Sequence, residues 1–208
     1  MSETAEPSLR DRKKMRTRDR IFVAAVELFG TRPYDDVTVE EICEKAEVGR
    51  ATFFRFYGSK AGLIGEYGRR LAEHIARRLD QMPGTTATQQ LWALQDEIVT
   101  AWGMSGPSTR EMAREWIRNA TADDLHAAHP PEMLALVADI VREGQGSGEF
   151  TTAYEPDLVA WVIMASLSSI TAAWLGGDDE SLAPRTRDTI SFLLTGLAAG
   201  PAPPAPAS

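Results

Sequence analysis

The sequence has little that would cross-link or export the chain. It contains one cysteine, Cys43, in 208 residues, which excludes a disulfide framework within one chain and leaves no reason to expect an oxidising compartment. Its first residues pass from polar to basic side chains without an apolar stretch, so no signal peptide is visible and we expect a cytoplasmic protein. Hydrophobic (43%) and charged (25%) residues occur in ordinary proportions for a globular protein, which excludes global disorder.

Positive charge is scarce beyond the first third of the chain. The formal net charge is −8, an unusual value for a nucleic-acid-binding protein. However, residues 1–78 hold 16 Lys and Arg against 13 Asp and Glu, whereas residues 79–208 hold 6 against 17. The densest run, residues 10–20, has seven basic and two acidic residues. This asymmetry favours binding of a polyanion at the N-terminal end, although a solvated helix start explains the run equally well on charge alone.

Strand patterns are also missing, because Val, Ile and Thr never alternate in runs bounded by turn residues. We therefore expect an all-α fold. Apolar residues at three- and four-residue steps predict a helix from about Arg16 to Phe29, a short helix that Thr38 caps, a third from about Arg50 to Phe56, and a long helix capped by Ser59. Further helices are predicted near 87–104, 108–120, 131–145, 156–175 and 183–198.

One uncharged stretch, Leu158 to Gly177, is long enough to span a bilayer. It contains several Ser and Thr residues, acidic residues flank it on both sides, and no Lys or Arg cluster sets an orientation. A helix buried in a helix–helix interface explains this stretch better, so we expect no membrane span.

Residues 38–57 have the layout of a helix-turn-helix, in which a capped short helix, a tight turn and a second short helix follow one another. Thr38 and Glu41 have the spacing of a capping box. The two helices are expected to be locked by an apolar seam of Val39, Ile42, Cys43, Ala46, Val48 and Phe53. Such a unit places its second helix in the DNA major groove. A three-helix scaffold with no DNA role fits the spacing as well.

Three stretches resemble the TetR family of regulators: RIFVAAVELF (20–29), YDDVTVEEI (34–42) and AEVGRATFFRFYGSK (46–60), followed by Leu63. A weaker similarity lies at 141–150. The resemblance implies an all-helical protein with an N-terminal three-helix DNA-binding domain and a C-terminal helical bundle that binds an effector and dimerises. It also implies that a homodimer binds a near-palindromic operator and usually represses transcription until the effector binds.

When the family's DNA contacts are carried over by position, the resemblance implies that Thr38 touches phosphate. It also implies that Lys60 holds phosphate at the start of the fourth helix, where the helix dipole favours an anion. Arg16 and Arg18 would reach the backbone or the minor groove ahead of the first helix. The residues expected at double-stranded DNA are Arg16, Arg18, Thr38, Arg50, Ala51, Thr52, Phe54, Arg55, Phe56, Tyr57 and Lys60.

Three positions depart from the family pattern. Phe54 stands where a tyrosine commonly bonds phosphate, Gly49 replaces a frequent serine or threonine, and Glu47 occupies a turn position where glycine is usual. Each change is expected to weaken DNA affinity, and Tyr57 is expected to compensate in part.

The second half of the chain is rich in Trp and Met. The resemblance places many of them on helices that surround the family's effector cavity, although ordinary core packing explains each one singly. We expect an apolar or amphipathic small-molecule effector to contact Trp92, Trp102, Met112, Trp116, Met133 and Trp161. The last two helices are expected to form the dimer interface, with Ala165, Ser169 and Ala173 allowing close approach; packing within one chain is the alternative.

Four segments are expected: a disordered basic arm (1–14), a DNA-binding domain (15–75), an effector-binding and dimerisation domain (76–199) and a disordered Pro/Ala tail (200–208). No nucleophile elbow, paired carboxylates or phosphate-binding glycine loop is recognisable, so we expect neither enzyme nor cofactor. His126 and His129 lack the further ligands that a metal site requires. Two alternatives remain: a regulator without a small-molecule effector, and a helical binding protein or enzyme that has lost DNA binding.

Overall fold

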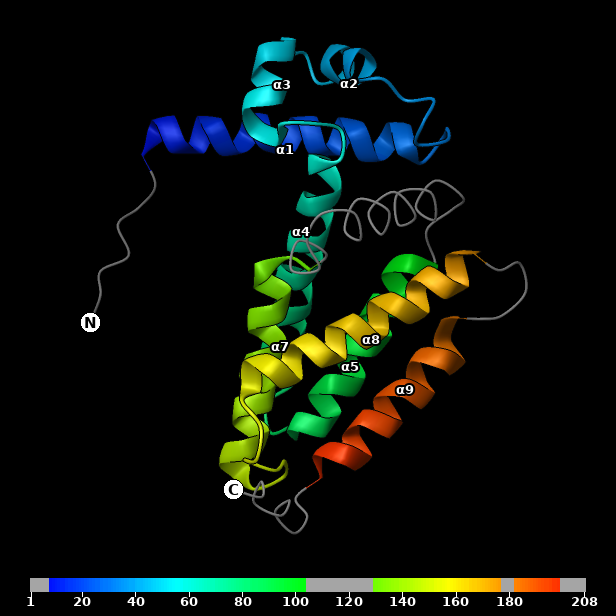
Figure 1. Ribbon diagram of the computed structural model, residues 1–208. Helices are drawn as coiled ribbons and strands as arrows, with labels where there is room; N and C mark the ends of the chain where they lie inside the picture. The colour runs from blue at the N-terminus through cyan, green and yellow to red at the C-terminus, as the bar shows by residue number, and fades with distance from the viewer. Residues whose placement is uncertain (1–7, 104–128, 177–181, 199–208) are drawn as a thin grey trace, which may run out of the picture.

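The computed structural model describes residues 8–103, 129–176 and 182–198, and these residues form eight α-helices (Figure 1). The all-helical prediction is confirmed. The helices are α1 (Leu9–Phe29), α2 (Val39–Lys45), α3 (Arg50–Tyr57), α4 (Gly62–Asp80), α5 (Ala87–Gly103), α7 (Pro131–Ser147), α8 (Pro156–Gly176) and α9 (Leu182–Leu197).

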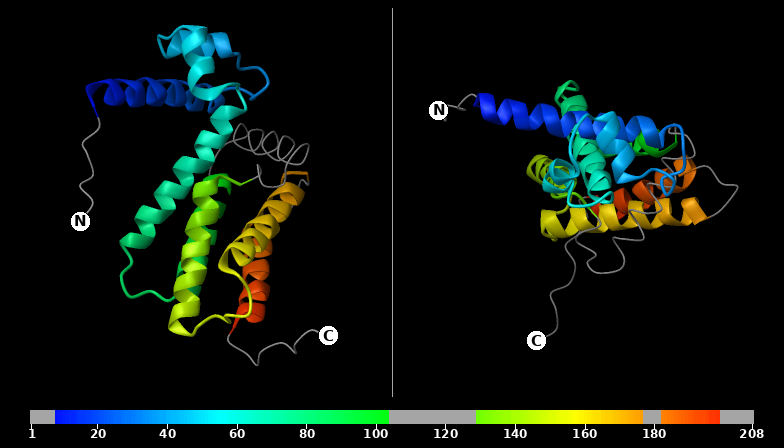
Figure 2. Two further views of the ribbon diagram at one scale, coloured as in Figure 1. Left: turned by 60° about the vertical axis from the view of Figure 1, so that its left-hand side comes forward. Right: turned by 90° about the horizontal axis from the view of Figure 1, so that it is seen from above.

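The molecule has two apolar cores joined by α4 (Figures 1 and 2). The smaller core lies among α1, α2, α3 and the first turn of α4, where Ile21, Ile42 and Phe53 are fully buried. The larger core lies among the rest of α4 and helices α5, α7, α8 and α9. Tyr67, in the second turn of α4, contacts both cores. Among the described residues, α4 is therefore the helix that contributes to both cores.

The helix-turn-helix forms as its local sequence predicts. The Thr38 hydroxyl accepts the Glu41 backbone N–H at 3.2 Å, and the Glu41 carboxylate accepts the Thr38 backbone N–H at 2.8 Å. This reciprocal capping fixes the first residue of α2. The predicted apolar seam is also confirmed, because Ile42, Cys43 and Ala46 are buried while Val39 and Val48 pack against the same core.

Two helix starts differ from the prediction. Helix α1 begins at Leu9 rather than near Arg16, because Ser8 caps it by accepting the Asp11 backbone N–H at 3.2 Å. The expectation of a disordered arm is therefore wrong for residues 9–14. Helix α4 begins at Gly62, and the Ser59 hydroxyl accepts the Gly62 N–H in the turn before it.

The later helices begin and end within two residues of their predicted bounds. The predicted helix 108–120 and the tail 200–208 lie outside the described residues. Among the residues that the structure describes, α8 alone has the length and composition to cross a membrane, and one third of that stretch (33%) is buried inside the chain. Ile163, Met164 and Leu167 of α8 belong to the larger core, as expected of a core helix.

Candidate DNA-binding and effector sites

Helix α3 presents most of the predicted DNA-reading side chains on one surface. Arg50, Ala51 and Arg55 are exposed, Phe54 is 41% exposed, and Phe53 on the opposite side is buried. Thr52 and Phe56 are half-buried. Arginine can pair with guanine edges and threonine can bond bases or phosphates, so this face has the chemistry of a recognition helix.

The arginines of α3 are held by weak surface contacts. Arg50 pairs with the exposed Glu40 and lies over the Phe54 ring at 5.7 Å, whereas Arg55 lies over the Phe56 ring at 5.1 Å. Exposed pairs of this kind contribute about 0–1 kcal/mol. Both guanidinium groups are thus easily redirected to a nucleic acid.

Thr38 is exposed at the start of α2, but its hydroxyl is occupied. Besides accepting the Glu41 N–H, it donates to the Glu41 carboxylate at 3.0 Å. A phosphate bound there has to replace that carboxylate as the acceptor. Arg16 is exposed on α1.

Arg18 points toward α4, although its side chain is still 42% exposed. Its guanidinium donates to the carboxylate of Glu66 on α4 at 2.6 Å, and the Glu66 side chain is 1% exposed. Arg69 and Arg70 donate to the same carboxylate at 2.7–2.9 Å. The predicted DNA contact of Arg18 stays a prediction, and it requires the guanidinium to leave this carboxylate. No local signal could reveal this, because the partners are 48 residues apart.

The Glu66 carboxylate stays ionised in this cluster. Burial by itself would raise the pKa of Glu66, but hydrogen bonds from Arg69 and Arg70 and the charge of Arg18 outweigh it, so the pKa lies below its ordinary value. Arg70 also pairs with Asp19 of α1. The cluster thereby fastens α1 to α4 through charged groups.

Tyr57 makes a hydrogen bond within the DNA-binding domain. Tyr57 is 8% exposed, and its hydroxyl donates to the Arg18 carbonyl at 2.8 Å. Burial and the nearby Glu66 raise the pKa of Tyr57 to about 12. The Tyr57 hydroxyl is thus engaged within the fold, and its expected compensation for the phosphate contact missing at Phe54 stays a prediction.

Lys60 binds the loop between α1 and α2. Its ammonium donates to the Tyr34 carbonyl at 2.7 Å and to the Val37 carbonyl at 3.0 Å, over the Tyr34 ring at 4.1 Å. Because α4 begins two residues later, Lys60 lies in the turn rather than at the helix N-terminus where it was expected.

The turn between α2 and α3 contains the departures at Glu47 and Gly49. Glu47 has a φ of 52°, and among the described residues no other non-glycine has a positive φ. Its side chain is 84% exposed and lies 3.9 Å from Arg20. Gly49 is the N-cap of α3 and supplies no side-chain cap.

A basic face on α1 was not predicted from the sequence. Arg10, Lys13, Lys14 and Thr17 lie at i, i+3, i+4 and i+7, on one face of the helix, and they border a groove against α3. Their spacing was readable, but only once α1 was known to begin at Leu9.

The candidate effector site is a cavity of about 30 Å³ inside the larger core, between α4, α5, α7 and α8. Predicted residues Trp102 and Met133 line it, whereas Trp92 and Trp161 are half-buried and do not. Met112 and Trp116 lie outside the described residues. Its walls are formed by Gly68, Leu71, Ile98, Trp102, Pro130, Met133, Met164, Leu167, Ser168 and Thr171.

This cavity is mostly apolar with a polar end. Thr171 donates to the Leu167 carbonyl at 2.8 Å, and the Ser168 hydroxyl lies 3.4 Å from Nδ1 of the buried His129. A volume of about 30 Å³ holds roughly one water molecule, so a larger ligand has to displace side chains. Met133 and Met164 are well suited to such movement because their side chains adapt readily.

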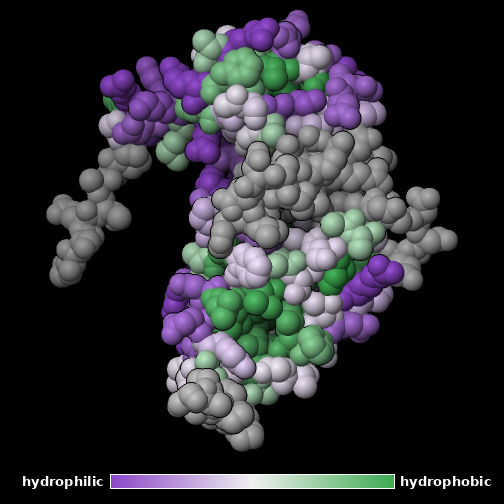
Figure 3. All heavy atoms as spheres, in the orientation of Figure 1, coloured by the Kyte–Doolittle hydropathy of each residue, from purple (hydrophilic) through white to green (hydrophobic). Residues whose placement is uncertain are grey.

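The predicted dimerisation residues follow one side of α8. Ser169 and Ala173 are exposed and Ala165 is half-exposed. Leu158 (53% exposed) and Val162 (38%) continue the same line at four- and three-residue steps. Figure 3 shows an apolar patch (green) over the N-terminal half of α8, below the hydrophilic side chains (purple) of α1.

Metal-binding and reactive groups are not conspicuous in the described part of the chain. No group of three or more His, Cys, Asp or Glu residues with the proximity of metal ligands occurs there. Cys43 is buried, and burial raises the pKa of its thiol, as fits a small core residue.

Comparison with known proteins gives the helix-turn-helix an identity. Residues 21–67 match the family model of the bacterial regulatory proteins of the tetR family. The regulator TcmR of Streptomyces glaucescens is 50% identical over 54 residues, which cover 26% of this chain and 24% of TcmR. Residues 21–67 therefore form a DNA-binding domain of the TetR family.

Similarity extends beyond the DNA-binding domain. MftR of Mycobacterium tuberculosis, proposed to regulate mycofactocin biosynthesis, is 25% identical over 174 residues, which cover 82% of this chain and 86% of MftR. FadR of Thermus thermophilus, a TetR-family repressor solved with lauroyl-CoA, has a TM-score of 0.70 at 24% identity, covering 92% of this chain and all of FadR. FadR of Bacillus subtilis, solved with stearoyl-CoA, has a TM-score of 0.63 at 18% identity, covering 86% and 98%. The DNA-binding domain and the fold of this protein are therefore those of the TetR-family transcriptional regulators, a family that is not enzymatic.

Proposed function

We propose that this protein is a cytoplasmic repressor that binds a palindromic operator as a homodimer and leaves it when an apolar or amphipathic small molecule enters the cavity beside α4. The observation that carries the proposal is the continuity of α4, whose second turn contacts both cores. Family membership supports the DNA-binding half, and the cavity supports the sensing half. The segments involved would be a DNA-binding domain at 15–75 and a sensing and dimerisation domain at 76–199.

Three consecutive residues of α4 provide the coupling in this proposal. Glu66 binds Arg18 of α1 at 2.6 Å. Tyr67 donates to the Ala101 carbonyl at 3.3 Å, and its ring lies 5.4 Å from the ring of Trp102 in the cavity wall. Gly68 lies so close to Pro130 that a Cβ at this position would be 2.6 Å from the ring of Pro130.

A ligand that expands the cavity displaces Trp102 and Pro130 from α4, so the helix has to turn or shift. Because α4 and α1 are joined by the Glu66 cluster, the recognition helix moves with it. Two recognition helices must fit half-sites about one helical turn apart, so a change in their separation releases the operator. A ligand shifts this equilibrium only by its difference in affinity for the two conformations.

The proposed effector class is a molecule with a long apolar part and a polar end. The cavity walls are largely aliphatic and aromatic, with Ser168 and Thr171 at one side. An acyl chain fits this chemistry, and two structures of similar fold contain acyl-CoA. We therefore propose acyl-CoA thioesters as the first ligands to test.

The test measures release of a fluorescently labelled operator duplex, identified by selection from a random pool, during titration with lauroyl-CoA. We expect lauroyl-CoA to release the duplex and CoA without an acyl chain to leave it bound. Met164→Phe, which adds bulk to the cavity wall, should raise the lauroyl-CoA concentration required by about tenfold, which corresponds to about 1.4 kcal/mol. Ala135→Phe, which adds bulk at an exposed position of α7 outside the cavity and outside the apolar line of α8, is the control and should change nothing.

A regulator without a small-molecule effector is the second candidate, and the small volume of the cavity favours it. In that case a panel of acyl-CoA thioesters, free fatty acids and other lipophilic compounds would release no duplex at any concentration. Such a result would contradict the sensing half of the proposal and leave the DNA-binding half intact.

A further inference from the structure

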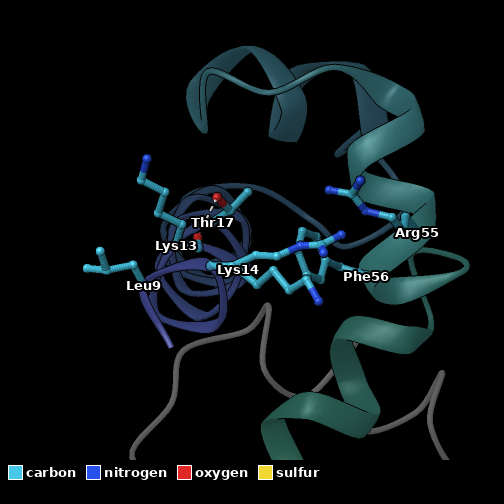
Figure 4. A pocket seen from close by; sticks show the side chains of 7 residues that line it. Leu9, Lys13, Lys14, Thr17, Arg55 and Phe56 are labelled. Atoms are coloured by element: carbon cyan, nitrogen blue, oxygen red, sulfur yellow. Dashed lines mark hydrogen bonds between the residues drawn. The ribbon is translucent and has the colours of Figure 1, made fainter. Parts of the chain in front are cut away.

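A basic groove lies between the first turns of α1 and the end of α3 (Figure 4). It is open to solvent, has a volume of about 820 Å³, and is separate from the apolar cavity beside α4. Figure 4 shows Arg55 projecting from α3 toward α1. The lining residues are Leu9, Arg10, Lys13, Lys14, Thr17, Arg55 and Phe56.

The charge of the groove is uncompensated. Four of its seven lining residues are cationic and none is acidic. Lys14 lies 3.8 Å from Asp11, an exposed pair that contributes little. With the residues that the structure describes, the side chains of Arg10, Lys13 and Arg55 form no ion pair. The groove therefore attracts an anion strongly without having to break a strong internal contact.

The cations form a line rather than a point. Arg10, Lys13, Lys14 and Thr17 occupy successive turns on one face of α1, and a rise of 1.5 Å per residue spreads them over roughly 10 Å. One DNA strand carries a phosphate about every 3.4 Å of helix axis, so such a line faces about three phosphates. A compact anion would engage only part of the groove, whereas a sugar-phosphate backbone matches its length.

The position of the groove agrees with that occupant. Arg55 forms one wall and also belongs to the exposed face of α3, so the groove is continuous with the proposed recognition surface. A helix in the major groove has a phosphate backbone on each side of it. Helix α1 passes crosswise below α3 in Figure 1 and extends past it at its N-terminal end.

We propose that this groove binds the sugar-phosphate backbone of duplex DNA beside the sequence read by α3, with Arg10, Lys13 and Lys14 contacting phosphates from an ordered helix. The inference rests on the proposed function, because α3 has to occupy the major groove. It adds a sequence-independent contact that lengthens the bound site. Base pairs that flank the half-sites then raise operator affinity, whatever their sequence.

The test compares Lys13→Gln/Lys14→Gln with wild type on the selected operator, both with 6 base pairs added at each end and trimmed to the palindrome. Glutamine is a good helix former, so α1 should persist, which circular dichroism checks. Arg77→Gln/Arg142→Gln is the control, because it removes the same charge from exposed positions outside the groove. Affinity is measured across a series of salt concentrations.

The groove variant removes two lysines from each protomer of the proposed dimer. We therefore expect it to lose about three to four units of the slope of log affinity against log salt, and about tenfold or more in affinity, on the extended duplex only. The control should match wild type on both duplexes. An unchanged slope, or an equal loss on the trimmed duplex, would overturn the groove contact while leaving DNA binding established. Failure of the wild-type protein to bind any duplex would overturn the proposed function itself.

Discussion

At the scale of single residues, Glu47 carries two costs in the turn of the helix-turn-helix. Its φ of 52° lies in the left-handed region, which costs a residue with a Cβ about 1–2 kcal/mol. Its exposed carboxylate also adds negative charge one turn ahead of α3, where a polyanion is expected to bind. Glycine at this position would remove both effects.

We therefore predict that Glu47→Gly and Glu47→Gln differ in a diagnostic way. Glu47→Gly should stabilise the protein by about 1 kcal/mol relative to Glu47→Gln in urea unfolding, because glutamine keeps the strained φ. Both variants should bind operator more tightly than wild type at low salt, because both lose the charge. Equal stability of the two variants would show that the turn is not strained.

At the scale of elements, the start of α2 depends on an ionised carboxylate. Hydrogen bonds from Arg32 and from the Thr38 backbone and hydroxyl lower the pKa of Glu41 to about 2. The pKa is lowered on folding, so the stabilisation is complete above the ordinary value near 4.5 and is lost as pH falls toward 2.

The matching prediction concerns Glu41→Gln, which keeps the shape of the capping group and loses its charge. It should destabilise the protein at pH 7, and the difference from wild type should shrink steadily between pH 4.5 and pH 2. Urea unfolding at several pH values measures this difference. A difference that stayed constant over this range would mean that the charge of Glu41 does not stabilise α2.

The junction of α1 and α4 depends on the buried Glu66. Glu66→Gln would leave Arg18, Arg69 and Arg70 together without their shared carboxylate. Breaking a buried ion pair typically costs 3–5 kcal/mol, and the partial exposure of the arginines reduces this, so we predict a loss of about 2–3 kcal/mol in stability. Glu73→Gln, which removes an exposed partner of Arg69, should cost less than about 0.5 kcal/mol. An equal loss of stability in the two variants would show that the Glu66 cluster does not hold α1 to α4.

Elements were predictable to different degrees. The helix-turn-helix follows from signals within a few residues, namely the capping box and the three- and four-residue spacing of its seam, and it formed as expected. The hydrogen bonds of Arg18, Tyr57 and Lys60 could not be read, because their partners lie 48, 39 and 23–26 residues away. Family resemblance placed these residues in the correct elements without revealing which way each side chain points.

At the scale of the whole molecule, the proposed dimer requires a partner for the exposed apolar side of α8. Leu158 and Val162 lie on this side beside the small residues Ala165 and Ser169, and Phe192 of α9 is 77% exposed. Isolated exposed apolar residues are common, but a line of them on adjoining helices is typical of an interface. This pattern was predictable from α8 only in part, since the sequence analysis expected small residues alone.

We predict that Val162→Glu converts the dimer to a monomer at micromolar concentration and weakens operator binding by at least about 100-fold, because the two half-sites are then bound separately. Val23→Glu, at a similarly exposed position on α1, is the control and should leave the protein dimeric. Sedimentation velocity reports both states. A wild-type monomer under these conditions would contradict the dimer proposal.

Whether this chain reads a palindromic duplex can be measured by selecting bound duplexes from a random DNA pool at two salt concentrations. We predict enrichment of one palindrome at both concentrations, with half-sites about one helical turn apart and weaker retention at the higher salt. Weak binding at low salt with no enriched sequence would contradict it, because the basic N-terminal half would then attract DNA without reading it.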